Sequence, residues 1–199
     1  MSFEQITRAL SRDAYLDAVA ALPTELPIAV AAIDVDHFDL INDQEGFEAG
    51  DEALRHVEDA LIAGLPGGAL LGHVKGDEWF AALPDATPEE LLIVLDGIRR
   101  GLAAAGRATI AGGIAARPQH GTTVDDLLAA ADGAQVRAKE GGGNRMTIAA
   151  EEKMVLKSSY YTKAALRRLS KLSERTQQTE ASHLREALDA HLAKHRDLT

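Results

Sequence analysis

The chain has 199 residues, of which 46% are hydrophobic, with a formal net charge of −10 and no cysteine. This length accommodates one medium domain plus a small module, and the absence of cysteine excludes disulfides, thiolate zinc sites and cysteine nucleophiles. No run approaches the ~18 apolar residues of a membrane span and the N-terminus lacks a signal-peptide pattern, so we expect a cytoplasmic protein that makes no membrane contact.

The first third of the chain predicts a helix, a buried strand and a second helix. Apolar residues recur at helical spacing over 11–22 and again over 48–65. Between them, 28–33 is a continuous apolar run, typical of a strand buried on both faces. This run ends in Asp34-Val35-Asp36, which places carboxylates at a strand end.

The middle of the chain predicts a hairpin and then an alternation of helices and strands. Strands over 69–74 and 79–83 enclose the turn 75–78, which carries Asp77 and Glu78. The elements that follow are a helix over 87–105, a strand over 107–116, a helix over 123–138 and a strand over 145–148. One layered α/β domain over 1–150 accounts for all of these segments.

The last 49 residues differ from the rest in pattern and in charge. Residues 1–150 contain 11 Lys and Arg against 24 Asp and Glu, a net charge of −13, whereas 151–199 contain 10 against 7, a net charge of +3. We expect a strand over 154–161, a helix over 162–175 and a second helix that Thr179 caps. Because this is too little core to fold alone, we expect a homodimer.

The acids at the strand end and at the hairpin turn are candidates for a metal site. If the turn lies beside the strand end, Asp34 and either Asp77 or Glu78 meet around a hard divalent cation such as Mg²⁺, which binds carboxylates and substrate phosphates together. The alternative is that these acids are solvated strand ends.

The order of several motifs identifies a family resemblance. The chain resembles the diguanylate cyclases that carry a GGDEF signature, with Lys75-Gly76-Asp77-Glu78-Trp79 at the position of that signature. The resemblance implies an α/β (α+β) cyclase/palm-like fold over 1–150, with a central mixed sheet flanked by helices. It rests on Asp34-Val35-Asp36-His37-Phe38, Ile41-Asn42-Asp43, Gly46, Gly50-Asp51, Gly76-Asp77-Glu78, Pro118-Gln119-His120-Gly121, Ala131-Asp132, Ala138-Lys139 and Gly143-Asn144-Arg145.

The resemblance also implies roles for individual residues. It assigns Mg²⁺ to the carboxylates of Asp34 and Asp77 and to the backbone carbonyl of Val35. It assigns recognition of guanine to Asn42 and Asp51, and phosphate binding to Lys139. Glu78 is the catalytic candidate if the domain is active.

Three departures from the family pattern predict a degenerate site. Lys75 replaces the first signature glycine, whose lack of a side chain allows close approach to the nucleotide. Asp39 and Gly143 stand where the family has a lysine and an arginine, so two phosphate-binding cations are missing. Lys75 restores one positive charge, and is therefore counted among the nucleotide-binding candidates. The inhibitory Arg-x-x-Asp motif of the family corresponds to 66–69, which lacks both charged residues.

The tail, 151–199, resembles ribbon-helix-helix DNA-binding proteins over about Met154 to Arg196. The resemblance rests on Leu169, Leu172, Thr176, Thr179, Leu184 and 185–188. In that architecture, one strand from each of two chains forms a ribbon that enters the major groove. The candidate DNA-binding residues are Lys157, Ser158, Tyr160 and Thr179. A dimerisation hairpin without DNA binding is the alternative.

The leading hypothesis is therefore a dimeric transcriptional regulator whose degenerate GGDEF domain senses a guanine nucleotide, cyclic di-GMP or one like GTP. The first alternative is an active diguanylate cyclase that makes cyclic di-GMP from two GTP and uses the tail for dimerisation. The second is a DNA-binding protein whose first domain binds nothing and only spaces the tail.

Overall fold

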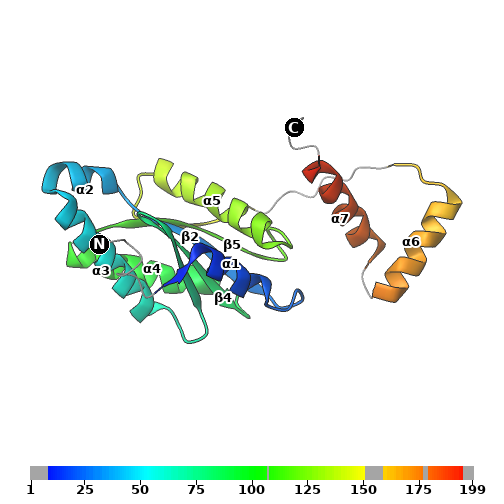
Figure 1. Ribbon diagram of the computed structural model, residues 1–199, viewed down its shortest axis with the longest axis horizontal. Helices are drawn as coiled ribbons and strands as arrows, with labels where there is room; N and C mark the ends of the chain where they lie inside the picture. The colour runs from blue at the N-terminus through cyan, green and yellow to red at the C-terminus, as the bar shows by residue number, and fades with distance from the viewer. Residues whose placement is uncertain (1–8, 107, 151–158, 177–178, 195–199) are drawn as a thin grey trace. The chain divides into compact units, whose positions relative to one another are not determined.

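The computed structural model describes residues 9–106, 108–150, 159–176 and 179–194. The chain divides into two compact units, Met1–Lys153 and Met154–Thr199. The first unit contains a six-stranded sheet with helices on both faces, and the second contains a pair of helices (Figure 1). Within the described residues, no helix has both the length and the apolar character needed to cross a membrane.

The sheet of the first unit is mixed, as predicted. Its strand order is β1-β3-β4-β2-β5-β6, with β2 antiparallel to both β4 and β5. The edge pairs β1–β3 and β5–β6 are parallel. The strands are β1 (Leu10–Ser11), β2 (Ile28–Val35), β3 (Leu70–Lys75), β4 (Glu78–Pro84), β5 (Ile110–Arg117) and β6 (Met146–Ile148).

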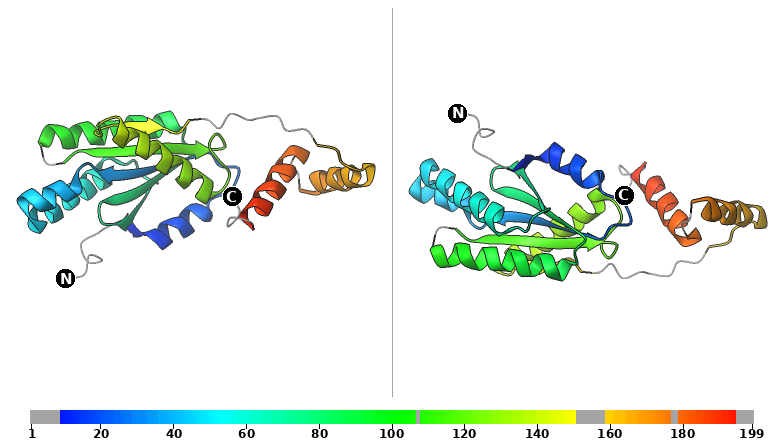
Figure 2. Two further views of the ribbon diagram at one scale, coloured as in Figure 1. Left: turned by 90° about the horizontal axis from the view of Figure 1, so that it is seen from above. Right: turned by 90° about the horizontal axis from the view of Figure 1, so that it is seen from below.

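Helices cover the two faces of the sheet in separate layers. On one face pack α1 (Arg12–Ala20) and α5 (Val124–Glu140), and on the other pack α3 (Phe47–Gly64) and α4 (Pro88–Ala105). The right-hand view of Figure 2 shows α1 on one side of the sheet and α4 on the other. Every residue of β2 except Asp34 is buried, which confirms a central strand covered on both faces.

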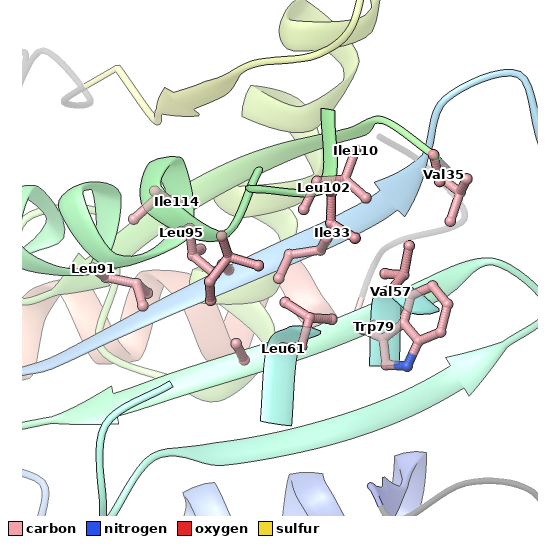
Figure 3. Close-up of a cluster of buried hydrophobic side chains, with 14 of the residues drawn as sticks. Ile33, Val35, Val57, Leu61, Trp79, Leu91, Leu95, Leu102, Ile110 and Ile114 are labelled. Atoms are coloured by element: carbon pink, nitrogen blue, oxygen red, sulfur yellow. The ribbon is translucent and has the colours of Figure 1, made fainter. Parts of the chain in front are cut away.

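The core between the sheet and the α3–α4 layer is built from large apolar side chains. Trp79 of β4 and Ile33 of β2 lie among leucines of the two helices, including Leu61 and Leu91 (Figure 3). On the opposite face, Gly113 of β5 brings the sheet close to α5. A Cβ atom on Gly113 would clash with the Ala131 carbonyl oxygen and the Gln135 nitrogen. The fold therefore depends on glycine at this strand position.

Local capping explains where α4 and α5 begin. Thr87 and Thr123 each accept a hydrogen bond from the backbone N–H three residues on, from Glu90 and Asp126. The carboxylates of Glu90 and Asp126 accept in return from the backbone N–H groups of Thr87 and Thr123. These reciprocal capping boxes satisfy N–H groups that have no partner inside the helix.

The structure contains one helix that the sequence pattern does not predict, α2 (Phe38–Glu45). It follows His37, whose φ of 56° is left-handed, and ends at Gly46, whose φ is 89°. No residue of α2 is fully buried, and its eight residues offer only Phe38 and Ile41, both partly buried, on the side that meets the core. This repeat is too short to predict a helix. Strand β5 also begins at Ile110 rather than at the predicted 107.

The second unit consists of α6 (Lys163–Thr176) and α7 (Glu180–Ala193). Thr162 caps α6 as predicted, because its hydroxyl accepts from the Ala165 N–H at 3.2 Å. Thr176 Oγ1 of α6 lies 2.7 Å from His183 Nε2 of α7 and links the two helices.

The predicted strand over 154–161 is wrong for the part that the structure describes. Residues 159–161 have no regular secondary structure, and 154–158 lie outside the described residues. A ribbon strand is stabilised by hydrogen bonds to a neighbouring strand, and no strand among the described residues pairs with 159–161.

Candidate functional site

The site forms where β2 ends beside the β3–β4 hairpin. Asp34 of β2 lies directly opposite Glu78 of β4 in the antiparallel register. Side chains at directly opposed positions lie on the same face of a sheet. For Asp34 and Glu78 this is the face that also carries Ala32 and Phe80, which α1 and α5 cover. The two carboxylates that the sequence places 44 positions apart are therefore neighbours.

The hairpin turn is tied to the end of β2 by its backbone. Val35 N–H donates to the carbonyl oxygen of Asp77 at 3.2 Å. Within the turn, Gly76 has a left-handed φ of 50°, and its carbonyl accepts from His73 Nε2 at 2.8 Å. The His73 ring stacks on Trp79 with centroids 5.0 Å apart. The predicted meeting of the turn and the strand end is thus present.

Lys139 of α5 completes the cluster. Its Nζ lies 2.7 Å from Asp34 Oδ1, so the lysine that the family resemblance assigns to phosphate pairs here with the first candidate metal ligand. Lys75, at the end of β3, is exposed and lies opposite Glu78 in the strand register. Two cations and at least two carboxylates therefore share this end of the sheet.

Burial and neighbouring charge shift the acidity of this cluster. Burial raises the pKa of Asp34 to about 6, although Lys139 favours the ionised form. Burial also raises the pKa of Glu78. The negative charge of Asp132 on α5 raises it further, whereas the positive charge of Lys75 lowers it. The pKa of Asp132 is itself raised by burial. A nearby cation would lower these values, so the cluster is suited to a positively charged ligand.

The donor set fits a magnesium ion that arrives with a nucleotide. Among the described residues, no three His, Cys, Asp or Glu side chains already stand together as a metal cage. Mg²⁺ does not require one, because it binds through one or two carboxylates and takes its remaining ligands from phosphates and water. Asp34 and the turn acids provide such carboxylates.

The predicted guanine-reading pair lies on neighbouring helices. Asn42 is on α2 and Asp51 is on the first turns of α3, and both side chains are half-buried. Gly50 permits the close approach of the two helices, because a Cβ atom there would clash with Asn42 Oδ1. That oxygen is buried and has no hydrogen-bond partner among the described residues.

Two positions where the family has cations are occupied differently here. Asp39 is exposed in the first turn of α2. Gly143 has a left-handed φ of 68°, and a Cβ atom there would lie 2.5 Å from Asp36 Oδ1. The Asp36 carboxylate accepts from the Asn144 N–H at 2.7 Å and so holds this loop close.

Sequence reasoning missed the residues that hold the loop around Asn144. Arg99 of α4 donates to Asn144 Oδ1 at 2.8 Å and to its backbone oxygen at 3.1 Å. Asp96 in turn binds Arg99 Nη2 at 2.7 Å. These partners are far apart in sequence, so only the ion pair between Asp96 and Arg99, three positions apart on one helix, has a local signal.

The candidate DNA-binding residues are placed only in part. Lys157 and Ser158 lie outside the described residues, and Tyr160 is fully exposed. The Thr179 carbonyl accepts from the His183 N–H at 3.2 Å at the start of α7.

Comparison with known proteins identifies the first unit. The family described as "Diguanylate cyclase, GGDEF domain" matches residues 8–145. "Probable diguanylate cyclase DgcF" of Escherichia coli K12 is 29% identical over 161 residues, covering 72% of this chain and 50% of that protein. "Probable diguanylate cyclase DgcC" of the same strain is 33% identical over 126 residues, covering 59% and 34%. The chain thus spans half or less of these curated relatives.

Solved structures show the same fold. The GGDEF domain of DgcB from Caulobacter crescentus, solved in complex with c-di-GMP, is 26% identical with a TM-score of 0.66, and the similarity covers 72% of this chain and 92% of that one. The GGDEF domain of PA1120 from Pseudomonas aeruginosa is 27% identical with a TM-score of 0.66, covering 73% and 92%. With its motifs, its mixed sheet and its hairpin in agreement, the chain belongs to the GGDEF diguanylate cyclase family.

Proposed function

We propose that the first unit binds GTP with Mg²⁺ and condenses two GTP molecules into cyclic di-GMP. The observation that carries this proposal is the meeting of Asp34, Glu78 and Lys139 at the strand end, with Asp77 in the adjoining turn. Carboxylates and a lysine at one point provide for a metal–triphosphate complex.

Each group has a proposed role in that reaction. The carboxylates of Asp34 and Asp77 and the carbonyl of Val35 hold the Mg²⁺, which when bound neutralises charge on the phosphates. Glu78 is the proposed catalytic acid or base, since it lies opposite Asp34 at the strand end and burial raises its pKa, which makes the carboxyl a better proton acceptor than an exposed one. Asn42 and Asp51 select guanine, because a carboxylate accepts from the guanine N1–H and exocyclic amine, which adenine lacks in that arrangement.

Lys139 changes partner in this proposal. In the structure its Nζ lies 2.7 Å from Asp34 Oδ1. With Mg²⁺ held at Asp34, the Lys139 ammonium group would exchange this carboxylate for a phosphate oxygen of the nucleotide. Lys139 and Lys75 are the proposed phosphate-binding cations.

The reaction is expected to be slow. Asp39 and Gly143 replace two cations of the family pattern, and preorganised positive charge supplies much of the rate in phosphoryl transfer. Two such sites must also face each other, so the reaction requires two copies of the chain.

Incubation of the full chain with GTP and Mg²⁺, followed by chromatography, tests the proposal. We expect cyclic di-GMP from the wild type and none from the matched variant Asp77→Asn. If the wild-type protein binds GTP but yields no product over many hours, the proposed cyclase activity is wrong. Nucleotide sensing without turnover is then the better account.

A second candidate function is DNA binding by the tail. It is supported by the helix pair α6 and α7, in which Thr162 caps α6 and several leucines are exposed and available to a second copy, namely Leu166, Leu172, Leu184, Leu188 and Leu192. In this candidate, Lys157, Ser158 and Tyr160 contact DNA, and Thr179 places the N-terminus of α7 near a phosphate. Nucleotide binding by the first unit then regulates the tail.

A gel-shift measurement with DNA upstream of the coding region, at two salt concentrations, tests this second candidate. A shift that weakens with salt and is lost in a Lys157→Ala, Tyr160→Ala variant is expected. The same titration with GTP or cyclic di-GMP present reports whether the two functions are coupled. No shift at low salt argues against DNA binding and leaves dimerisation as the role of the tail.

A further inference from the structure

An exposed aromatic side chain stands at the corner between α2 and α3. Phe47 is the first residue of α3 and is 80% exposed. The corner is a single residue, Gly46, so Phe47 is held where two helices meet rather than on a long loop. Isolated apolar side chains are common on protein surfaces, and what distinguishes Phe47 is its position between α2 and α3.

Helical geometry places Phe47 beside the predicted guanine pair. Residues four apart on a helix lie on the same side, one turn from each other, which relates Phe47 to Asp51. Residues three apart are also neighbours, which relates Phe47 to Gly50. Gly50 packs directly against Asn42, because a Cβ atom on Gly50 would clash with Asn42 Oδ1. Phe47 therefore lies one turn along α3 from the contact between α3 and Asn42.

We propose that the Phe47 ring stacks on the purine base that Asn42 and Asp51 recognise. This inference rests on the proposed guanine-nucleotide site and adds to it the group that covers one face of the base. Asn42 and Asp51 supply polar atoms for the edge of the base, and an aromatic ring supplies the apolar contact for its face.

The proposed roles of Phe47 and Asp51 differ in what they contribute to binding. Stacking is tolerant of base identity, so Phe47 contributes to affinity, whereas Asp51 decides between guanine and adenine. Because the ring does not contact phosphates, its loss weakens binding of GMP and of GTP by the same factor. A residue that acted through the metal or the phosphates would weaken GTP alone.

Binding of GTP and of GMP to the full chain, measured by titration calorimetry, tests this inference. Phe47→Ala is expected to weaken both by about fivefold or more, the lower end of what a base–aromatic stack contributes. The matched control is Ile93→Ala, since Ile93 is 72% exposed on α4 and should leave both affinities unchanged. Thermal unfolding of each variant at the wild-type temperature verifies the fold.

Phe47→Trp gives a direct signal from the same position. It should retain affinity and introduce an exposed indole whose fluorescence is quenched when a purine stacks on it, against the buried Trp79 of the wild type. Phe47→Ala with wild-type affinity for both nucleotides, or a Phe47→Trp signal that GTP leaves unchanged, would overturn the inference while the proposed function stands. Wild-type protein that binds neither nucleotide overturns both. Loss of dimer in sedimentation, with affinity unchanged, assigns Phe47 to an interface and also overturns it.

Discussion

The two units bury their apolar side chains to very different extents. In the first unit, Leu91 and Leu95 of α4 are fully buried against the sheet, and both faces of the sheet are covered. In the second unit, no residue of α6 is buried, and Leu172 and Leu188 are 45% and 57% exposed. A sheet between two helix layers satisfies its apolar surface within one chain, whereas two helices alone do not. The first unit is therefore expected to be independent of a partner for folding, and the second dependent on one.

The largest expected effect tests whether the first unit carries the proposed formation of cyclic di-GMP. Asp34→Asn removes the charge that pairs with Lys139 and is proposed to bind metal, and we expect cyclic di-GMP formation to fall about 100-fold or more. Sedimentation of this variant should match the wild type. Asp85→Asn, at the opposite end of the sheet after β4, is the control and should retain activity. Equal loss in both variants would contradict the assignment of Asp34.

The dependence of the second unit on a partner can be broken by a charge on its apolar side. Leu172→Asp places a carboxylate among the leucines of α6, and burying an unpaired charge in an interface is costly. We expect the dissociation constant of the dimer, measured by analytical ultracentrifugation, to rise by about tenfold or more. The control is Lys171→Asp, one position away on the same helix. It introduces the same carboxylate at a position that should stay solvated, so it should leave the dimer intact. A dimer unaffected by Leu172→Asp would show that the tail leucines serve another purpose.

The self-sufficient packing of the first unit is expected to be sensitive to a single methyl group. Gly113→Ala forces β5 away from the Ala131 carbonyl of α5 and should lower the free energy of unfolding by about 1–3 kcal/mol. Chemical denaturation followed by circular dichroism measures this change. The oligomeric state, which we propose that the second unit sets, should not respond. Unchanged stability would mean that β5 and α5 adjust more freely than their contact suggests.

The smallest expected effect concerns pH and the loop beside the site. Hydrogen bonds from Arg99 and Arg100 lower the pKa of Asp96 below its ordinary 3.8, despite some burial. A carboxyl group with a lowered pKa in the folded state stabilises the fold above pH 3.8, and that contribution is lost as the pH falls below it.

Asp96→Asn should therefore cost up to about 1 kcal/mol at pH 7, as for other partly exposed ion pairs, and progressively less below pH 4. Urea unfolding at several pH values measures the difference between the two proteins. A difference that stays constant down to pH 3 would assign the effect to hydrogen bonding of the side chain rather than to its charge.

The sequence by itself determined the strand that carries Asp34 and the order of the elements of the first unit other than β1 and α2. Continuous apolar residues over 28–33, helical repeats and threonine caps are local patterns, and local patterns predict local structure. The acids of the hairpin turn and the lysine of α5 were also recognisable, because the family motifs that contain them are contiguous. The helix α2 escaped prediction because it is only eight residues long and just two of its apolar residues, Phe38 and Ile41, pack against the core.

Only the tertiary structure decided which of these groups meet. Lys139 reaches Asp34, and Asp36 binds Asn144, across more than 100 positions of sequence. The need for glycine at position 143 cannot be predicted from the residues next to it in sequence. It arises because the left-handed backbone of Gly143 lies against the carboxylate of Asp36, which follows β2. Such contacts follow from the strand order and from the close approach of β5 and α5, and these are properties of the packed sheet rather than of any one segment.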